Sequence, residues 1–373
     1  MKPDETIYLD YVATTPVAPQ VVTAMLPYLT TAYGNPSSTH AFGRTAKLAV
    51  EEARGSIASF LNVKPNEIIF TSGGSESNVL AIKGMLQKKG RGHLILSAVE
   101  HPSSLDAAKQ LEKQGYAVTL VNPTSEGEIC LSTIEDSITD ETALVSVMVG
   151  NNEIGTINDV EAMASLCKER GVTFHTDAAQ AVGHLPFEAS RFDLTTLTGH
   201  KLYAPKGVGV LVVKEPITLH PMIQGGQAER GLRGGTLNVA SIVGLGKAIE
   251  LCQTTHSHSI ATIRDCCEAL LREQLPTIVI NGKCDARFPH ILSVQFPSLG
   301  PDFSPAMIQG VACSAGSACQ SGIGSHVLKA IGKNESEIAS TLRLSFGRQT
   351  SEDDMKKAVN SIIFCVNQCV SRV

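Results

Sequence analysis

The sequence predicts an α/β fold, in which a large domain holds a mostly parallel seven-stranded sheet covered by helices and a smaller domain is α+β. Short β-branched runs alternate with amphipathic stretches over roughly the first 250 residues, which is typical of parallel strands joined by helices. Several of these runs are continuously apolar, as expected of strands that are covered on both faces. The alternation stops after about residue 250, which indicates a second folding unit.

The predicted elements follow from this pattern in chain order. Seven runs read as strands of the large domain: Glu67–Thr71, His93–Ser97, Ala117–Val121, Ala143–Val149, Thr173–Thr176, Asp193–Leu197 and Val208–Val213. Four amphipathic stretches read as helices between them: Arg44–Leu61, Glu76–Lys89, Ser103–Gln114 and Asp159–Arg170. The spacing of apolar residues, 3.6 in helices and 2 in strands, separates the two classes.

The second unit mixes helices and strands without regular alternation. Four of its segments are expected to be helical: Ile260–Leu275, Ser304–Gln309, Gly324–Ile331 and Glu352–Arg372. Two more are expected to be strands: Ile278–Asn281 and His290–Phe296. We therefore predict a large domain at residues 15–251 and a small domain built from residues 1–14 and 252–373.

Composition narrows the class of protein. The 373 residues are 43% hydrophobic and carry a net charge of −5, which suits an enzyme with a large core and argues against nucleic-acid binding. No apolar stretch approaches the ~20 residues of a membrane span, and the N-terminus lacks the pattern of a targeting peptide, so we expect a cytoplasmic protein. The ten cysteines form no CxxC pair, and we expect reduced thiols and no metal site.

A lysine and an aspartate each follow a predicted strand. Lys201 ends the segment Thr198–Lys201, and Asp177 closes an apolar run about two dozen residues upstream. A lysine amine can condense with an aldehyde and an acid can keep a pyridine nitrogen protonated, so the pair suits pyridoxal phosphate (PLP). In such sheets ligands collect at the carboxyl ends of strands. The alternatives are a solvated surface lysine and an aspartate that caps a helix.

A glycine- and serine-rich turn, Thr71–Ser77, leads from a predicted strand into a predicted helix. Glycines allow close approach of the backbone, and a helix N-terminus offers free N–H groups to an anion, so Gly74 and Ser75 are candidates for binding phosphate. Thr198 and His200 could add donors. An ordinary strand-to-helix turn explains this segment about equally well.

Three further polar residues follow predicted strands. Gln180 lies one helical turn beyond Asp177 and could reach the phenolic oxygen of the ring. His101, in Val99–Pro102, could stack on an aromatic ring and move protons, and Asn152 is placed similarly after another strand. A lone histidine more often has a structural role.

Two residues of the second unit complete the candidate set. Small residues surround Cys319 in Cys313–Gly322, which suggests a mobile loop that could bring a thiolate to a substrate, although a buried and inert cysteine is the commoner case. Cys313, in an apolar context, is expected to be inert. Arg343 alternates with apolar residues on a strand and could bind a carboxylate or form a structural salt bridge.

The whole set resembles the cysteine desulfurase family, the NifS/IscS-like branch of the class V aminotransferases, which have PLP fold type I. The most specific parts of the resemblance are Gly-His-Lys at 199–201, Asp-Ala-Ala-Gln at 177–180 and Ala-Gly-Ser-Ala-Cys at 315–319. The resemblance covers nearly the whole chain, from Leu9–Tyr11 through Gly34–Ser38 to Gly347–Arg348.

The resemblance implies a role for each cofactor residue. Lys201 binds the cofactor aldehyde and shuttles protons, Asp177 pairs with the ring nitrogen, and His101 stacks on the ring and assists proton transfer. The other members bind the phosphate (Gly74, Ser75, Thr198 and His200) or the phenolic oxygen (Gln180 and Asn152).

The resemblance also implies partners. Thr236 would reach the phosphate in a second subunit, so a homodimer is expected, and Arg343, with Asn35 nearby, would bind the carboxylate of L-cysteine. The Cys319 thiolate would take the substrate sulfur as a persulfide, releasing L-alanine, and pass it to an acceptor protein in iron–sulfur cluster assembly or in tRNA or cofactor thiolation. Another PLP enzyme, such as a selenocysteine lyase or an aminotransferase, is the alternative, and a non-catalytic scaffold is a third reading.

Three places depart from the family pattern. Gly225–Arg230 lacks a glycine followed by Gln or His that many relatives have, and Gln320–Ser325 is about two residues shorter than in IscS-like relatives. Val12 stands where alanine is usual. The first two bear on the reach of the cysteine loop and on the preferred acceptor.

Overall fold

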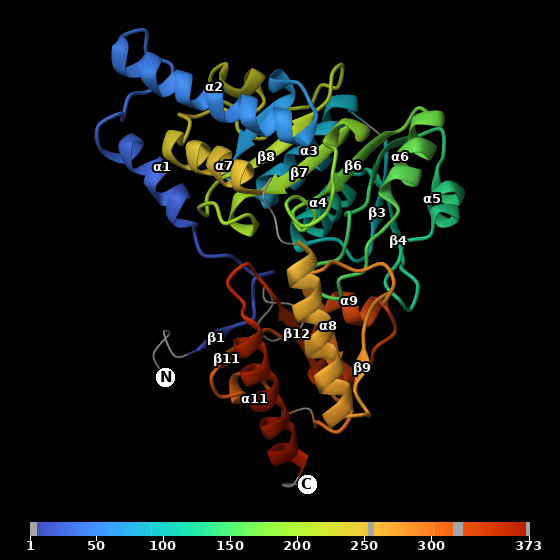
Figure 1. The fold of residues 1–373 in the computed structure, drawn as a ribbon. Coiled ribbons are helices and arrows are strands. Elements are labelled where there is room, and N and C mark those ends of the chain that lie inside the picture. Colours follow the sequence, from blue (N-terminus) through green and yellow to red (C-terminus); the bar gives the residue numbers. More distant parts are fainter. Residues whose placement is uncertain (1–5, 91, 253–256, 301, 316–323, 371–373) are drawn as a thin grey trace.

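A seven-stranded sheet forms the centre of the larger body (Figure 1). The computed structural model describes residues 6–90, 92–252, 257–300, 302–315 and 324–370. In spatial order the strands are β2 (Ile68–Thr71), β8 (Gly209–Val213), β7 (Leu194–Thr198), β6 (Thr173–Asp177), β5 (Thr142–Ser146), β3 (His93–Ser97) and β4 (Ala117–Val121). Only β8 runs against its neighbours, so the predicted mostly parallel sheet is confirmed.

Helices cover both faces of the sheet because alternate residues of each strand point to opposite sides. Ile68 and Phe70 of β2 join the core under α2 (Ala41–Leu61), α6 (Val160–Glu169) and α7 (Val239–Cys252). Ile69 of the same strand joins the opposite core, under α3 (Gly74–Lys89) and α4 (Pro102–Lys113). Two shorter helices complete this body: α1 (Pro19–Thr30) and α5 (Leu131–Ser137).

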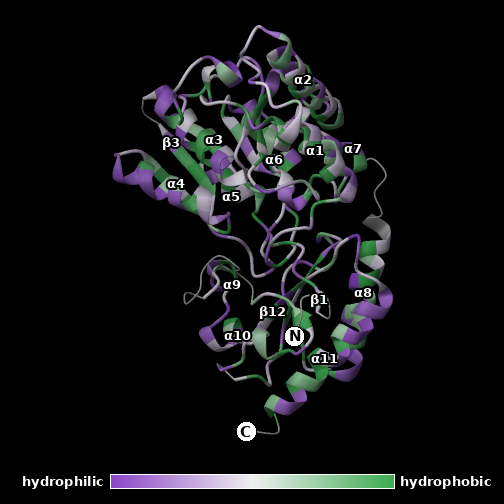
Figure 2. Cartoon of the chain, turned by 90° about the vertical axis from the view of Figure 1, so that its left-hand side faces the viewer, coloured by the Kyte–Doolittle hydropathy of each residue, from purple (hydrophilic) through white to green (hydrophobic). Residues whose placement is uncertain are grey.

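The smaller body is α+β, as predicted. A three-stranded antiparallel sheet has the order β12 (Thr341–Ser345), β10 (Ile291–Gln295) and β9 (Val279–Ile280), and β1 (Ile7–Tyr8) pairs with β11 (Val311–Ala312). The helices are α8 (Ser257–Gln274), α9 (His326–Ala330), α10 (Glu335–Ala339) and α11 (Glu352–Val370). Figure 2 shows α8 and α11 striped with hydrophobic and hydrophilic residues, as expected of helices that bury one face.

A separate core holds the smaller body together. It draws on Leu9 and on residues between 260 and 366, which agrees with a small domain assembled from both ends of the chain. The division at residues 14/15 and 251/252 stays a prediction. No helix in the described part of the chain is long and apolar enough to cross a lipid bilayer.

Two expectations about helices need correction. The segment expected to be helical at Ser304–Gln309 is only a single 3-10 turn, Pro305–Met307, because no apolar period extends the turn further. Helix α7 was not predicted because ten of its fourteen residues are buried, so it lacks the polar face on which an amphipathic pattern depends.

A buried ion pair anchors the segment that departs from the family pattern. Glu229 and Arg230 have φ of 47° and 59°, a region that side-chain-bearing residues seldom adopt. The Glu229 carboxylate accepts two hydrogen bonds from Arg54 of α2, at 2.6 and 3.1 Å, and one from the Phe70 N–H at 2.6 Å. These contacts fix the segment against α2 and β2 despite its backbone conformation.

Removing the charge of Glu229 should destabilise the protein. Glu229→Gln removes the buried counter-ion of Arg54 and leaves only Glu51, whose side chain is half exposed, and we expect the free energy of unfolding in urea to fall by about 3 kcal/mol. Glu215→Gln breaks an exposed pair with Lys64 and is the matched control, which should leave unfolding nearly unchanged. Equal effects of the two substitutions would contradict the anchoring role.

Candidate active site

A cavity of about 340 Å³ lies where residues that follow the strands of the large sheet meet β12 of the smaller body. Ten of the thirteen predicted site residues line it: Gly74, Ser75, His101, Asn152, Asp177, Gln180, Thr198, His200, Lys201 and Arg343. The structure therefore brings together most of the set that was predicted from separate segments. Wider grooves of about 700 and 630 Å³ lie elsewhere, but their linings contain none of these ten residues.

Three predicted residues are not in this group. Asn35 and Thr236 are exposed and do not line the cavity of their own chain, so Asn35 is not brought beside Arg343 within one chain. The Asn35 side chain instead accepts from the Ser37 N–H at 2.9 Å. Cys319 lies outside the described residues.

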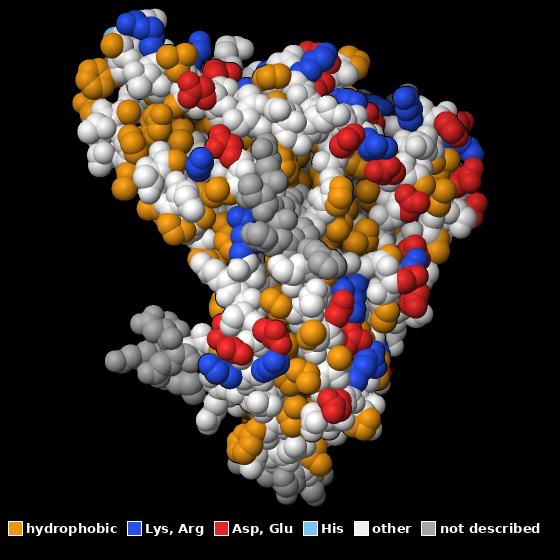
Figure 3. Space-filling view, in the orientation of Figure 1, with side chains coloured by type: hydrophobic (Ala, Val, Ile, Leu, Met, Phe, Trp, Pro, Cys, Tyr) orange, Lys and Arg blue, Asp and Glu red, His pale blue; other side chains and the backbone are white. Residues whose placement is uncertain are grey.

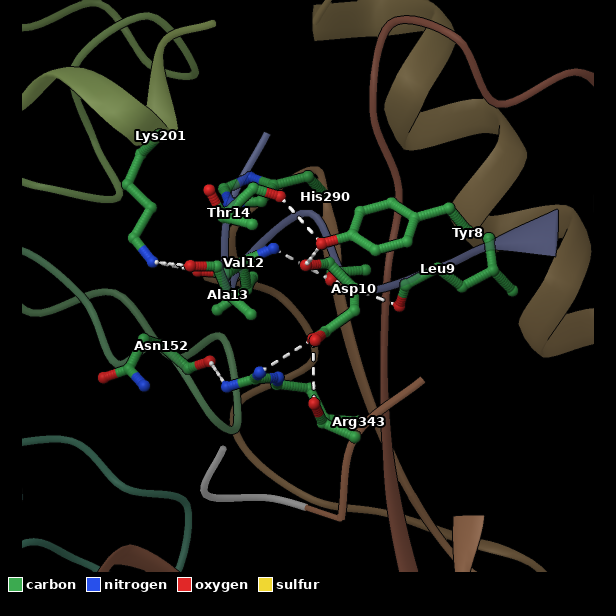
Figure 4. A network of polar contacts seen from close by, with 12 residues as sticks. Tyr8, Leu9, Asp10, Val12, Ala13, Thr14, Asn152, Lys201, His290 and Arg343 are labelled. Atoms are coloured by element: carbon green, nitrogen blue, oxygen red, sulfur yellow. Dashed lines mark hydrogen bonds and ion pairs between the residues drawn. The ribbon is translucent and has the colours of Figure 1, made fainter. Parts of the chain in front are cut away.

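Lys201 reaches the cavity from a single 3-10 turn, Gly199–Lys201, directly after β7. Its amine donates to the backbone carbonyls of Val12 and Ala13, the latter at 2.6 Å (Figure 4). Val12 is 2% exposed and also accepts from Gln180 at 3.3 Å. The N-terminal segment therefore forms one wall of the cavity and holds the lysine amine in it.

Asp177 ends β6 with a carboxylate that is almost fully buried, the residue being 8% exposed. One oxygen accepts from Asn78 Nδ2 at 2.8 Å and the other from the Ala179 N–H at 2.9 Å. These bonds offset the cost of burying the charge. Asn78 was not predicted, although it lies one turn beyond Gly74 on α3, where the same helix face meets the cavity.

His101 is the N-cap residue of α4, and its side chain contacts Ser103. The Ser103 N–H donates to His101 Nδ1 at 3.2 Å, so in the neutral ring the proton is on Nε2. Burial lowers the pKa of His101, Asp177 raises it in part, and Lys201 lowers it again. Asn78 also donates to Ser103 Oγ at 3.1 Å, which connects the Asp177 carboxylate to the support of His101.

The N-terminus of α3 and the end of β7 form a polar cradle. Gly73 has φ of 156°, and a Cβ on Gly209 would lie 2.7 Å from the Gly73 backbone, so both positions need glycine for this close approach. A Cβ on Gly74 would lie 3.5 Å from Thr198, so the Thr198 side chain borders the free N–H groups of the helix. This arrangement suits a phosphate group.

Burial lowers the pKa of His200 to about 4, helped by the charge of Lys201. Its Nδ1 lies 3.2 Å from the Thr14 hydroxyl. His200 is therefore a neutral polar group beside the cradle at physiological pH.

Arg343 is 2% exposed, and its guanidinium contacts both the N-terminal segment and the loop that contains Asn152 (Figure 4). Its Nη2 pairs with Asp10 at 3.0 Å and its Nη1 donates to the Asn152 carbonyl at 3.2 Å, while Nε has no partner among the described residues. The salt bridge that was the alternative interpretation is therefore present. The guanidinium still lines the cavity, so a second carboxylate could contact it.

The described residues on either side of the Cys319 segment are fixed near the cavity. Ser314 donates to Asp10 at 2.9 Å, and Ser325 donates to the buried Glu153 carboxylate. Burial raises the pKa of the Cys313 thiol to about 12, which agrees with the expectation that Cys313 is inert.

His326 and two buried acids were not predicted. His326 lines the cavity and its Nε2 lies 3.0 Å from the Glu100 carbonyl. Burial raises the pKa of Glu153, with an opposing effect of its hydrogen bond from Ser325. Sequence reasoning placed His326 in a helix but had no signal for its position, because that position depends on contact between the two bodies.

This donor set could hold a flat cofactor that carries an aldehyde, a basic ring nitrogen and a phosphate. Lys201 supplies an amine, Asp177 a buried carboxylate, and the α3 N-terminus with Thr198 an anion cradle. Within the described ranges, no group of three or more His, Cys, Asp or Glu side chains is arranged to bind a metal ion.

Comparison with known proteins gives consistent matches. The family profile described as Aminotransferase class-V matches residues 7–357. The protein named Cysteine desulfurase IscS of Neisseria meningitidis serogroup C is 42% identical over 368 residues, which cover 95% of this chain and 91% of that protein. A solved structure described as NifS-like protein superposes with a TM-score of 0.90 at 30% identity, covering 97% of this chain and all (100%) of the other. Another, described as SspA in complex with cysteine, has a TM-score of 0.84 at 37% identity, covering 91% and 99%.

Glu100 should give a specific dependence of stability on pH. Burial raises its pKa well above the ordinary value of 4.5, and its Oε2 has no hydrogen-bond partner among the described residues. The folded state then binds more protons than the unfolded state above pH 4.5, so this contribution to stability is lost as pH rises through the folded pKa.

Glu100→Gln removes this ionisation with little change of shape. We expect the variant to gain stability relative to the wild type as the pH of urea denaturation is raised from 5 to 8. A stability difference between the two proteins that stays constant over this range would show that Glu100 is already ionised in the folded protein.

Proposed function

This chain belongs to the class-V aminotransferase family and, within it, to the NifS/IscS-like cysteine desulfurases, and we propose that it removes sulfur from free L-cysteine with the help of PLP. The observation that carries the proposal is that Lys201, Asp177 and the N-terminus of α3 meet in one cavity. These are the three groups that the aldehyde, the ring nitrogen and the phosphate of PLP require.

When bound, PLP would supply an electron sink that weakens the Cα–H bond of the amino-acid substrate. Asp177 would keep the ring nitrogen protonated, since its carboxylate is already oriented by Asn78 and the Ala179 N–H. Lys201 would move a proton at the substrate Cα once its amine has left the carbonyls of Val12 and Ala13. His101, kept neutral by burial, would cover the ring and assist proton transfer.

Arg343 would bind the substrate carboxylate. Its guanidinium is fixed by Asp10 and Asn152, so the orientation of an incoming carboxylate would be set before binding. Gln180 and Asn152 would contact the phenolic oxygen of the ring.

The Cys319 thiolate would then attack the sulfur of the substrate. A bond forms between the two sulfur atoms and the substrate Cβ–S bond breaks, so the product carbon skeleton keeps the electron pair and leaves as L-alanine after protonation. Cys319 is left as a persulfide, and transfer of its outer sulfur to an acceptor restores the thiolate. No external oxidant is needed for this sequence.

The proposed homodimer would complete each site. Pro36, Ser37, Gly235 and Leu237 line the groove of about 630 Å³, so the sequence neighbours Asn35 and Thr236 share one region of the surface. Thr236 of the partner subunit would reach the phosphate, and the partner subunit's Asn35 would lie near the same cavity.

Exposed apolar side chains support this dimer. Figure 3 shows hydrophobic side chains gathered over α1 and α2. Large residues there are between 44% and 69% exposed: Val22, Leu26, Leu29, Tyr33, Phe42 and Leu48. A patch of this kind is typical of a protein–protein interface.

The destination of the sulfur is the finer part of the proposal. We propose that the acceptor is a protein of iron–sulfur cluster assembly or of tRNA or cofactor thiolation, and that the enzyme works in the cytoplasm. Isolating the protein that receives 35S from the Cys319 persulfide would identify the acceptor.

The activity is tested with L-cysteine and a thiol reductant. We expect sulfide and alanine in equal amounts from the wild type. Cys319→Ser should abolish both products while keeping the absorbance of bound cofactor, and Cys313→Ala is the matched control that should keep most of the activity. Full sulfide production by Cys319→Ser would overturn the role of Cys319, and alanine without sulfide would favour a different reaction.

Sharing of the site between subunits is tested by mixing two inactive variants. Lys201→Ala removes the amine, and Thr236→Glu places a negative charge beside the phosphate of the neighbouring site. After reassortment, half of the dimers are mixed and each has one intact site, so about a quarter of the wild-type activity should return. A mixture of Lys201→Ala with Lys201→Arg is the control and should remain inactive, and failure of the first mixture to recover would contradict a shared site.

A further inference from the structure

Two histidines stack against each other behind the cavity. The rings of His184 and His290 have centroids 3.8 Å apart and planes inclined by 21°. His290 precedes β10 and is 1% exposed, whereas His184 follows the Asp177–Gln180 segment and borders the groove of about 700 Å³. The pair therefore joins the smaller body to the larger one directly beside the cofactor site.

His290 contacts one residue of the predicted cofactor set. Its Nε2 lies 3.2 Å from Gln180 Oε1, and Gln180 Nε2 donates to the Val12 carbonyl at 3.3 Å. A carbonyl oxygen only accepts, so the Val12 contact requires the amide nitrogen of Gln180 on that side. The amide oxygen then faces His290, which must donate through Nε2–H.

This arrangement determines what Gln180 can offer to the cavity. Its carbonyl oxygen is occupied by His290, and one of its two amide hydrogens is used by Val12. The remaining amide hydrogen is available for an acceptor in the cavity that Gln180 lines. Without His290, only the long Val12 contact of 3.3 Å would hold the amide in this orientation, and a turned amide would present its oxygen, which would repel a phenolate.

His184 extends the contact to Lys201. It makes a hydrogen bond to the Lys201 backbone, and burial together with the charge of Arg348 lowers its pKa to about 4. Burial also lowers the pKa of His290, as do His184, Arg264, Lys201 and Arg343. Both rings are thus neutral at physiological pH and can stack without repulsion.

The cost of burying His290 argues for more than packing. Its Nδ1 is buried and has no hydrogen-bond partner among the described residues, which is unfavourable for a polar atom. A leucine would fill a similar volume without this cost. The bond from Nε2 to Gln180 is the compensating contact that the structure provides.

We propose that His290 is a positioning residue that, stacked on His184, fixes the amide orientation of Gln180 so that an N–H faces the phenolic oxygen of PLP. The inference rests on the proposed cofactor site. It concerns the strength of one contact to the cofactor rather than the chemical step.

The test compares two ligands of the apoprotein: PLP and 3-deoxypyridoxal 5′-phosphate, which lacks the phenolic oxygen. His290→Leu should bind PLP about tenfold more weakly, the loss of one hydrogen bond, and should bind the deoxy compound as tightly as the wild type does. His290→Gln, whose amide nitrogen lies near the position of Nε2, should restore PLP binding. His290→Leu combined with Gln180→Leu should be no weaker than Gln180→Leu alone.

Controls separate this role from general stability. His93→Leu removes another buried imidazole, which contacts Thr119 of β4 and Thr142 of β5 and does not line the cavity, and should lower stability without changing PLP affinity. If His290→Leu does not fold, His290→Asn replaces it, because its amide lies near the Nδ1 position and should not restore binding.

Two results would overturn this inference and leave the proposed function standing. In the first, His290→Leu weakens the binding of PLP and of the deoxy compound equally. In the second, His290→Gln binds PLP as weakly as His290→Leu does. A wild-type apoprotein that does not bind PLP would instead overturn the proposed function, and the inference with it.

Discussion

The buried guanidinium of Arg343 is the interaction on which the rest of the site depends. It lies on β12 of the smaller body, pairs with Asp10 of the N-terminal segment and donates to Asn152 of the larger body. Arg343 is only 2% exposed, and a guanidinium this deeply buried is tolerated only when it is paired with an acid. Because Asp10 lies two residues before Val12, whose carbonyl accepts from the Lys201 amine, the same pair fixes one wall of the cavity.

Two histidines of the cavity are uncharged. Burial lowers the pKa of His101 and of His200, so these two imidazoles are neutral beside Lys201 and Asp177. Uncharged imidazoles do not compete with the Lys201 amine for an anionic group of a ligand. A single carboxylate facing the cavity from β6 is then the natural partner of one basic ring nitrogen.

Local sequence features predicted the parts of the site that depend on strand ends. Asp177, Lys201 and His101 each follow a buried strand, and a parallel sheet brings such positions together whatever the details of packing. Asn78 and His290 could not be found in this way, since their importance comes from contacts with residues 99 and 110 positions away. Asn35 was placed beside Arg343 by resemblance alone, and the folded chain leaves it on the surface. Helix α7 was missed because burial on all sides removes the amphipathic signal.

Substrate binding and the Cys319 segment are connected through Asp10. Ser314, five residues before Cys319, donates to the same Asp10 oxygen that pairs with Arg343. A substrate carboxylate that binds Arg343 must share the guanidinium with Asp10, the acceptor of the Ser314 hydroxyl, and the Ser314 backbone is itself hydrogen-bonded to Arg343. The carboxylate-binding arginine and Ser314 are therefore connected through one aspartate oxygen and through their own backbones.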